Sequence, residues 1–196
     1  KAFFLAGGPG SGKTYVTSRI TGGLGLKNVN SDSAFERALK KAGLSLDMPP
    51  EEEYFRDKVR AKSKAVTGKS LDLYIQGRLG LVIDSTARDV LKIYTGLAAL
   101  KRLGYECHMI FVNTSLDVAL ARIDIVKKSH AEIQQNMGKL QMLFGMKNFY
   151  VIDNNKANDD ILAKAYKMVA RIVKKPITNR TAKMWMRKEL EKRRAK

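Results

Sequence analysis

Eight residues near the start of the chain, Gly7 to Thr14 (GGPGSGKT), have the types and spacing of a phosphate-binding loop. They fit the pattern G-x-x-x-x-G-K-[ST] in full, and an apolar run, Phe3 to Ala6, precedes them. Glycines let backbone N–H groups close around phosphate oxygens, and the helix that follows adds the positive end of its dipole. The residues predicted to bind a nucleotide are Gly8, Pro9, Gly10, Ser11, Gly12, Lys13 and Thr14.

Two side chains of this loop would act on the phosphates directly. Lys13 is the lysine that such loops direct to the β- and γ-phosphates, where it would assist catalysis. Thr14 supplies a hydroxyl for Mg²⁺, a hard ion that prefers oxygen ligands. The loop therefore predicts ATP and Mg²⁺ as cofactors.

Two carboxylates follow apolar segments that have the character of strands. Asp32 comes after the short strand in KNVNSD, and Asp84 ends the run LGLVIDST. Ligands of open α/β sheets bind at the carboxyl ends of the strands, so both acids are expected beside the loop. A hydroxyl that attacks a γ-phosphoryl group needs a carboxylate within hydrogen-bonding reach, which favours Asp32; its alternative role is to cap a helix starting at Ser33.

Apolar segments and amphipathic segments alternate along the chain. The expected strands are Ala2–Ala6, the short strand of 27–32, Leu79–Thr86, Glu106–Asn113 and Phe149–Asn155, and the helices between them include a long charged one from Glu51, with a bend at Gly68. This order predicts an α/β fold in three layers, a five-stranded parallel sheet flanked by helices. We expect a kinase-like domain over residues 1–175 and, after Pro176, a basic C-terminal helix or tail over 176–196.

Composition limits the class of protein further. The chain has 196 residues, of which 44% are hydrophobic, which is enough for one buried core. No apolar stretch approaches the roughly 18 to 20 residues of a membrane span, and no signal segment opens the sequence, so a cytoplasmic location is expected. The single cysteine, Cys107, excludes an internal disulfide and is expected in the core, and the two distant histidines argue against structural zinc.

The charge is large and uneven. The formal net charge is +18, and residues 161–196 hold thirteen Lys or Arg against two Glu, a net of +11. Charge of this density indicates a polyanionic partner, with nucleic acid the first choice, or an anionic substrate. The last helix, expected over 179–196 with Ala182, Met186 and Leu190 on one side, is a nucleic-acid arm, a docked helix with a solvated basic face, or an anionic-membrane helix.

GGPGSGKT, NVNSD and VIDST together resemble the P-loop kinases of the polynucleotide kinase and zeta-toxin-like group, of the type that bacteriophages encode. The resemblance covers roughly residues 1 to 155 and includes IVKKSHAEIQQNM, which looks like the helix after that group's lid. It implies that Asp32 accepts the proton of the acceptor hydroxyl and that Asp84 contacts Mg²⁺ directly or through water, unless Asp84 is purely structural. Arg88 would hold the acceptor or pair with a carboxylate, and the adenine would lie near Asp153 to Asn155.

The resemblance also implies a lid whose arginines neutralise charge on the transferring phosphate. We expect it near residues 122–124, where Ala121-Arg122 runs straight into Ile123-Asp124 and leaves little length for it. Arg122 is the candidate catalytic arginine of this lid.

Three functions follow from these observations. The first is ATP-dependent phosphorylation of a hydroxyl on nucleic acid, either a 5′ end or a hydroxymethylated base in phage-type DNA. The second is phosphorylation of a small hydroxyl compound such as a nucleoside, nucleotide or nucleotide sugar. The third is a nucleotide-binding module that regulates a partner.

Overall fold

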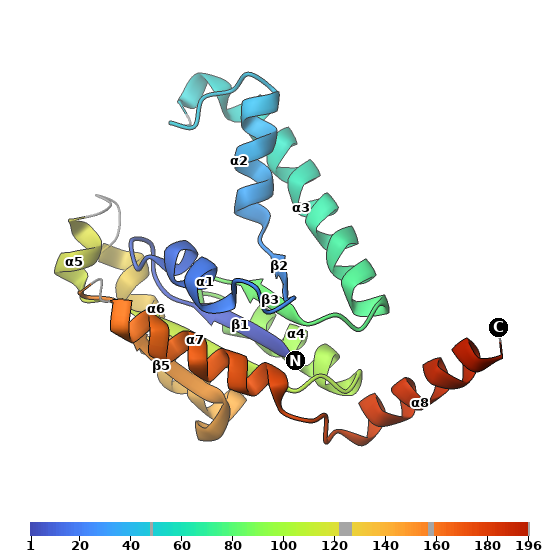
Figure 1. Cartoon of the computed structure of the whole chain (residues 1–196). Helices are drawn as coiled ribbons and strands as arrows, with labels where there is room; N and C mark the ends of the chain where they lie inside the picture. Colours follow the sequence, from blue (N-terminus) through green and yellow to red (C-terminus); the bar gives the residue numbers. More distant parts are fainter. Residues whose placement is uncertain (48, 122–126, 157–158, 196) are drawn as a thin grey trace.

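A parallel sheet of five strands forms the centre of the molecule (Figure 1). The computed structural model describes residues 1–47, 49–121, 127–156 and 159–195, and the statements below refer to these residues. The strands lie in the order β2-β3-β1-β4-β5, and each neighbouring pair is parallel. Their bounds are β1 Ala2–Ala6, β2 Lys27–Val29, β3 Leu81–Asp84, β4 Cys107–Asn113 and β5 Phe149–Asp153. The predicted fold class is confirmed, with all strands but the first shorter than expected.

Helices cover both faces of the sheet, because successive side chains of each buried strand point to opposite sides. Phe3 and Leu5 pack with α1 (Lys13–Thr21) and α7 (Asp159–Lys174). Phe4 and Ala6 pack on the other face with α4 (Val90–Arg102) and α6 (Lys127–Phe144). The result is the three-layer arrangement that the alternation of segments predicts.

Two helices beside β2 stand away from the sheet (Figure 1). They are α2 (Ser31–Lys41) and α3 (Glu53–Gln76), which pack along each other after a short 3₁₀ turn, η1 (Pro50–Glu52). Two expectations were wrong here. α2 begins at Ser31 rather than Ser33, because the side chain of Asn30 caps it. α3 runs unbroken through Gly68.

The remaining elements connect or extend these layers. They are α5 (Leu116–Leu120), the 3₁₀ turn η2 (Met146–Asn148) and the C-terminal α8 (Arg180–Arg194). Ala182, Met186 and Leu190 follow one another at intervals of four residues in α8 and so share one side, as expected. Met186 and Leu190 are 43% and 55% exposed, whereas Ala182 and Trp185 are half-buried. The division of the chain after residue 175 stays a prediction.

Other expectations concern features that the chain was predicted to lack. Among the described residues, no helix combines the length and the apolar character that crossing a bilayer requires. In the same part of the chain, no three His, Cys, Asp or Glu side chains gather as metal ligands would.

Cys107 is buried in β4, and burial raises the pKa of its thiol to about 11. It is therefore an unreactive core residue, as expected.

Candidate active site

The phosphate-binding loop joins the end of β1 to the start of α1. Gly10 and Gly12 have φ angles of 73° and 79°, in the left-handed region that favours glycine. A Cβ atom on Gly10 would lie 2.7 Å from the carbonyl oxygen of Ala119, so the loop backbone passes directly against α5. The helix that follows begins at Lys13, and its first N–H groups are therefore free to meet an anion at this end.

Side chains that directly follow β4 and β5 hold this loop in place through hydrogen bonds. The carbonyl oxygen of Ser11 accepts hydrogen bonds from Asn154 Nδ2 at 2.7 Å and from Thr114 Oγ1 at 3.3 Å. His130 Nε2 in turn donates to the carbonyl oxygen of Thr114 at 2.6 Å. Asn154 and Thr114 are buried, so these bonds are protected from water.

The sequence did not identify this bracing role. Asn154 lies in the segment expected near the adenine, yet its side chain holds the phosphate-binding loop. Asn155 Oδ1 accepts a hydrogen bond from the backbone N–H of Ser115 at 2.6 Å and so ties the two strand ends together. A polar residue directly after each of the two neighbouring strands β4 and β5 is the signal from which this role could have been recognised.

Lys13 lies over its own loop, where Nζ donates to the carbonyl oxygen of Gly7 at 2.9 Å. Burial lowers the pKa of Lys13, and the nearby carboxylates of Asp84 and Asp32 oppose that shift. Ser11 Oγ is buried in the same loop without a hydrogen-bond partner among the described residues. A lysine and a hydroxyl so placed fit the phosphate oxygens of a nucleotide, which would satisfy both.

Asp32 and Asp84 meet at the carboxyl edge of the sheet, and Asn30 joins their elements. Asn30 Oδ1 accepts hydrogen bonds from the backbone N–H groups of Asp32 at 2.7 Å and Ser33 at 3.3 Å. Its Nδ2 donates to Asp84 Oδ2 at 2.8 Å. The alternative that Asp32 caps α2 is therefore wrong, because Asn30 is the capping residue. The side chain of Asp32 is exposed and is not used as a cap.

The surroundings of Asp84 fit a divalent cation. Burial raises the pKa of its carboxyl group, the positive charge of Lys13 opposes the shift, and the negative charge of Asp32 adds to it. Oδ1 of Asp84 is buried and has no hydrogen-bond partner among the described residues. Thr14 lines the same cleft. Mg²⁺ would satisfy the unpaired oxygen and offset the repulsion between the neighbouring carboxylates of Asp84 and Asp32, so Asp84 and Thr14 fit this ion.

The segment after β3 forms the next part of the site. Arg88 Nε donates to Glu132 Oε2 at 3.1 Å, so of its two predicted roles the structure contains the ion pair with a carboxylate. Ala87 has a φ of 64°, and Asn136 Nδ2 donates to its carbonyl oxygen and to that of Arg88, both at 3.1 Å. Strained backbone of this kind persists where its surroundings hold it, and here α6 does so. Arg122, the predicted lid arginine, lies outside the described residues.

A cleft of about 1440 Å³ connects these parts. Lys13, Thr14, Asp32, Asp84 and Arg88 all line it, so the structure brings together the predicted catalytic, metal-binding and acceptor-binding residues that it describes. The cleft continues between α3 and α4, where its wall is apolar and consists of Leu71, Ile75, Ile93, Leu100 and Leu103. This inner wall was not recognised from the sequence, because its residues come from two helices with no direct signal of proximity.

The sheet order, the phosphate-binding loop before α1 and the acids at the neighbouring strand ends define the P-loop kinase fold. More particularly, the chain belongs to the family described as AAA domain (AAA_33), whose model matches residues 3–143.

Solved structures support the fold. A candidate kinase from Chloroflexus aurantiacus superposes with a TM-score of 0.59 and 17% identity, over 87% of this chain and 97% of that one. A sugar kinase from Janibacter superposes with a TM-score of 0.51 and 16% identity, over 90% and 99%. No curated protein sequence matches the chain. At such identities the superpositions establish the fold alone.

Proposed function

We propose that this protein transfers the γ-phosphate of ATP to a hydroxyl group of a small, uncharged molecule bound in the cleft. The observation that carries the proposal is the joint placement of Lys13, Thr14, Asp32 and Asp84 on one cleft that also extends to an apolar inner wall. The part of the cleft beside Lys13 and Thr14 fits a nucleotide, and the part beside the apolar inner wall fits an acceptor. Both known neighbours described above are named as kinases, which agrees with this assignment.

Each of these four residues has a role in the proposed reaction. Lys13 and the backbone N–H groups of the loop hold the β- and γ-phosphates, and Thr14 and Asp84 would hold Mg²⁺, which neutralises charge on them. Asp32 accepts the proton of the acceptor hydroxyl as that oxygen bonds to the γ-phosphorus. The bond between this phosphorus and the β-phosphate oxygen breaks, and ADP leaves.

The charge of the cleft favours an uncharged acceptor. Among the described residues, its lining has four basic side chains, Lys13, Arg88, Lys92 and Lys139, against five acidic ones, Asp32, Glu36, Asp84, Asp89 and Glu132. Lys13 is assigned to the nucleotide and Arg88 is paired with Glu132, which leaves few cations for an anionic acceptor. The cleft thus differs from the chain as a whole, whose net charge is +18. An acceptor with a hydroxyl and an uncharged body suits it best.

A hydroxyl on nucleic acid is the second candidate, and the net charge of +18 favours it. In that case only an uncharged part of the polymer, such as a modified base, would enter the cleft, and the phosphates would stay outside. This version requires the base to leave the stack or to lie in a single strand.

The test is a transfer assay with γ-labelled ATP and Mg²⁺. Neutral hydroxyl compounds (sugars, polyols and nucleosides) are compared with their phosphorylated counterparts, with 5′-hydroxyl oligonucleotides and with DNA that contains hydroxymethylated bases. The proposal predicts label on a neutral compound at low and at high salt. Label on the polymers alone, weakened by salt, would replace the first candidate by the second.

A matched pair of variants locates the acceptor. Ile75→Asn places an amide on the apolar inner wall and should raise the KM for the acceptor while leaving the KM for ATP unchanged. Val66→Asn makes a similar change on the outer, exposed side of the same helix and should change neither value. Equal effects of both substitutions would show that the inner wall does not bind the acceptor.

A further inference from the structure

The basic charge of the chain is concentrated on a stretch that does not line the cleft. Between Asp160 and Glu189, residues 161–188 contain nine Lys or Arg and no Asp or Glu. The nine are Lys164, Lys167, Arg171, Lys174, Lys175, Arg180, Lys183, Arg187 and Lys188. None of them takes part in a salt bridge within the described residues. Half of the net charge of +18 is therefore unneutralised on α7, α8 and their connection.

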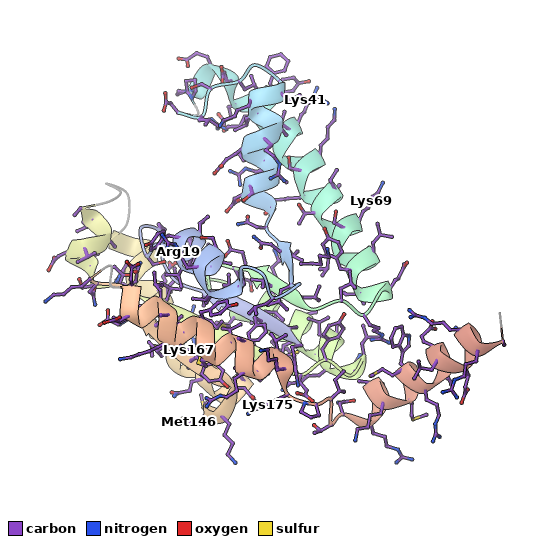
Figure 2. The ribbon with its side chains drawn as sticks, in the orientation of Figure 1. Arg19, Lys41, Lys69, Met146, Lys167 and Lys175 are labelled. Carbon is purple, nitrogen blue, oxygen red and sulfur yellow. The ribbon has the colours of Figure 1, made fainter. Side chains whose placement is uncertain are left out.

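On α7 these side chains form a single row. The helix buries Leu162, Ala165, Val169 and Ile172 against the sheet. Lys164, Lys167, Arg171 and Lys174 follow one another at intervals of three or four residues and are all exposed, so they share the solvent side over about 15 Å of helix. Figure 2 labels Lys167 and Lys175 on this part of the molecule.

The C-terminal end of this row is hollowed. Lys167, Arg171, Lys174 and Lys175 surround a shallow depression of about 630 Å³ together with Tyr166 and Pro176. The lining of this depression contains no carboxylate. Four positive side chains around one hollow repel each other, and an anion with several charges would relieve that repulsion.

α8 continues the basic surface as an ordered helix. Asn179 Oδ1 accepts a hydrogen bond from the N–H of Ala182 at 3.2 Å, and a Cβ on Gly104 would lie 2.7 Å from that same nitrogen. The guanidinium of Arg78 lies 5.5 Å from the ring centroid of Trp185. These contacts fix the first turns of α8 to the body, while the rest projects outward (Figure 1).

Four of the seven basic residues of α8 lie on one side. Arg180, Lys183, Arg187 and Arg194 are spaced by three, four and seven residues, which places them together over about 21 Å. All four are exposed. Trp185, which faces the body, lies on the opposite side of the helix.

We propose that α7 and α8 form a binding surface for the phosphate backbone of nucleic acid, separate from the cleft. Two long rows of exposed cations match a polymer that carries one negative charge per about 1.7 Å of duplex. An anionic membrane fits less well, because the apolar side of α7 is buried in the core and cannot enter a bilayer.

This surface is independent of the proposed phosphotransfer. α7 packs against the sheet on the same face as α1, and none of the described residues that line the cleft belongs to α7 or α8. Binding of nucleic acid would therefore continue when the catalytic residues are replaced. The surface would bring the protein to a polymer whether the acceptor is part of that polymer or a small molecule.

The experiment is a fluorescence-anisotropy titration of a labelled, mixed-sequence DNA duplex with the full chain, without ATP, at several salt concentrations. The first variant combines Lys167→Gln, Arg171→Gln and Lys174→Gln, and the second combines Arg180→Gln, Lys183→Gln and Arg187→Gln. The matched control combines Lys62→Gln, Lys64→Gln and Lys69→Gln on α3, three exposed lysines whose loss lowers the net charge equally. Circular dichroism confirms that each variant is folded.

We expect each of the two test variants to bind about tenfold or more weakly, and the slope of log K against log salt to fall by about 2 to 3, since each lost phosphate contact contributes about 0.9. The α3 control and Lys13→Ala should bind as the unaltered protein does. Equal weakening in the α3 control would overturn the proposal, because binding would then follow net charge. It is also overturned if the duplex does not bind.

Discussion

Asn30 gives the sharpest test of how the site is built, because one side chain serves two acids. Its oxygen caps α2 through Asp32 and Ser33, and its amide donates to Asp84 at 2.8 Å. Loss of a helix cap costs about 1 kcal/mol. Loss of a hydrogen bond to a charged group costs about 1.5 to 3 kcal/mol. Asn30→Ala removes both and should lower the free energy of unfolding by about 3 kcal/mol.

Asn30→Ser separates the two contributions, since serine caps helices about as well as asparagine but does not reach Asp84. It should lower the free energy of unfolding by about 2 kcal/mol, leaving a difference of about 1 kcal/mol between the serine and alanine variants. Asn28→Ala, at an exposed position in β2 two residues before Asn30, should change it by less than about 0.5 kcal/mol.

The assay is urea unfolding at neutral pH, followed by circular dichroism, together with the Mg²⁺ concentration that half-saturates nucleotide binding. Because Asn30 orients Asp84, Asn30→Ser should raise that concentration about tenfold, as is usual when a residue that orients a metal ligand is lost. The reasoning is refuted if Asn30→Ser matches the unaltered protein in both measurements.

Three further predictions follow. Gly10→Ala forces a side chain into the left-handed region and against Ala119, so it should lower the free energy of unfolding by about 2 kcal/mol or more and abolish binding of a fluorescent ATP analogue. The control is Gly43→Ala, at a φ of 71° with nothing within 4 Å of the added Cβ, which should lower the free energy of unfolding by about 1 kcal/mol and leave binding intact. Burial raises the pKa of Asp84, so its ionised form lowers stability above that pKa; Asp84→Asn should raise the thermal midpoint at pH 7 without nucleotide, and this gain should shrink as the pH falls. Burial lowers the pKa of His108 to about 4, so the free energy of unfolding should decline as the pH falls from about 6.5 to about 4, by up to about 1.4 kcal/mol per pH unit. His108→Leu should flatten that decline when urea unfolding is measured at each pH.

The elements of the fold were predictable because their signals are local. Apolar runs such as the one before Gly7 and the one ending at Asp84 mark central strands, and glycines mark the ends of helices. The start of α2 was misplaced by two residues because three consecutive polar residues, Asn30, Ser31 and Asp32, are all good caps. Only the hydrogen bonds decide among them.

The site was predictable only in part, because some of its residues are marked by local sequence signals and others are not. Lys13, Asp32 and Asp84 follow from one motif and from the rule that strand ends meet at one edge. Asn154, Thr114 and Asn30 act through hydrogen bonds between segments far apart in the sequence, and no spacing encodes these. The balance of charge in the cleft was likewise not evident, because the net charge of +18 gives no sign that acids outnumber bases among the described residues of the lining.

The most direct test of the proposed phosphotransfer is the Asp32→Asn variant, measured for ATP binding and for transfer of labelled γ-phosphate to the acceptor found in the panel. Asparagine keeps the size of the side chain but is a far weaker proton acceptor. The proposal predicts unchanged ATP affinity and transfer reduced by about a hundredfold or more. Unchanged transfer to the acceptor would contradict it and would remove Asp32 from the chemistry of the site.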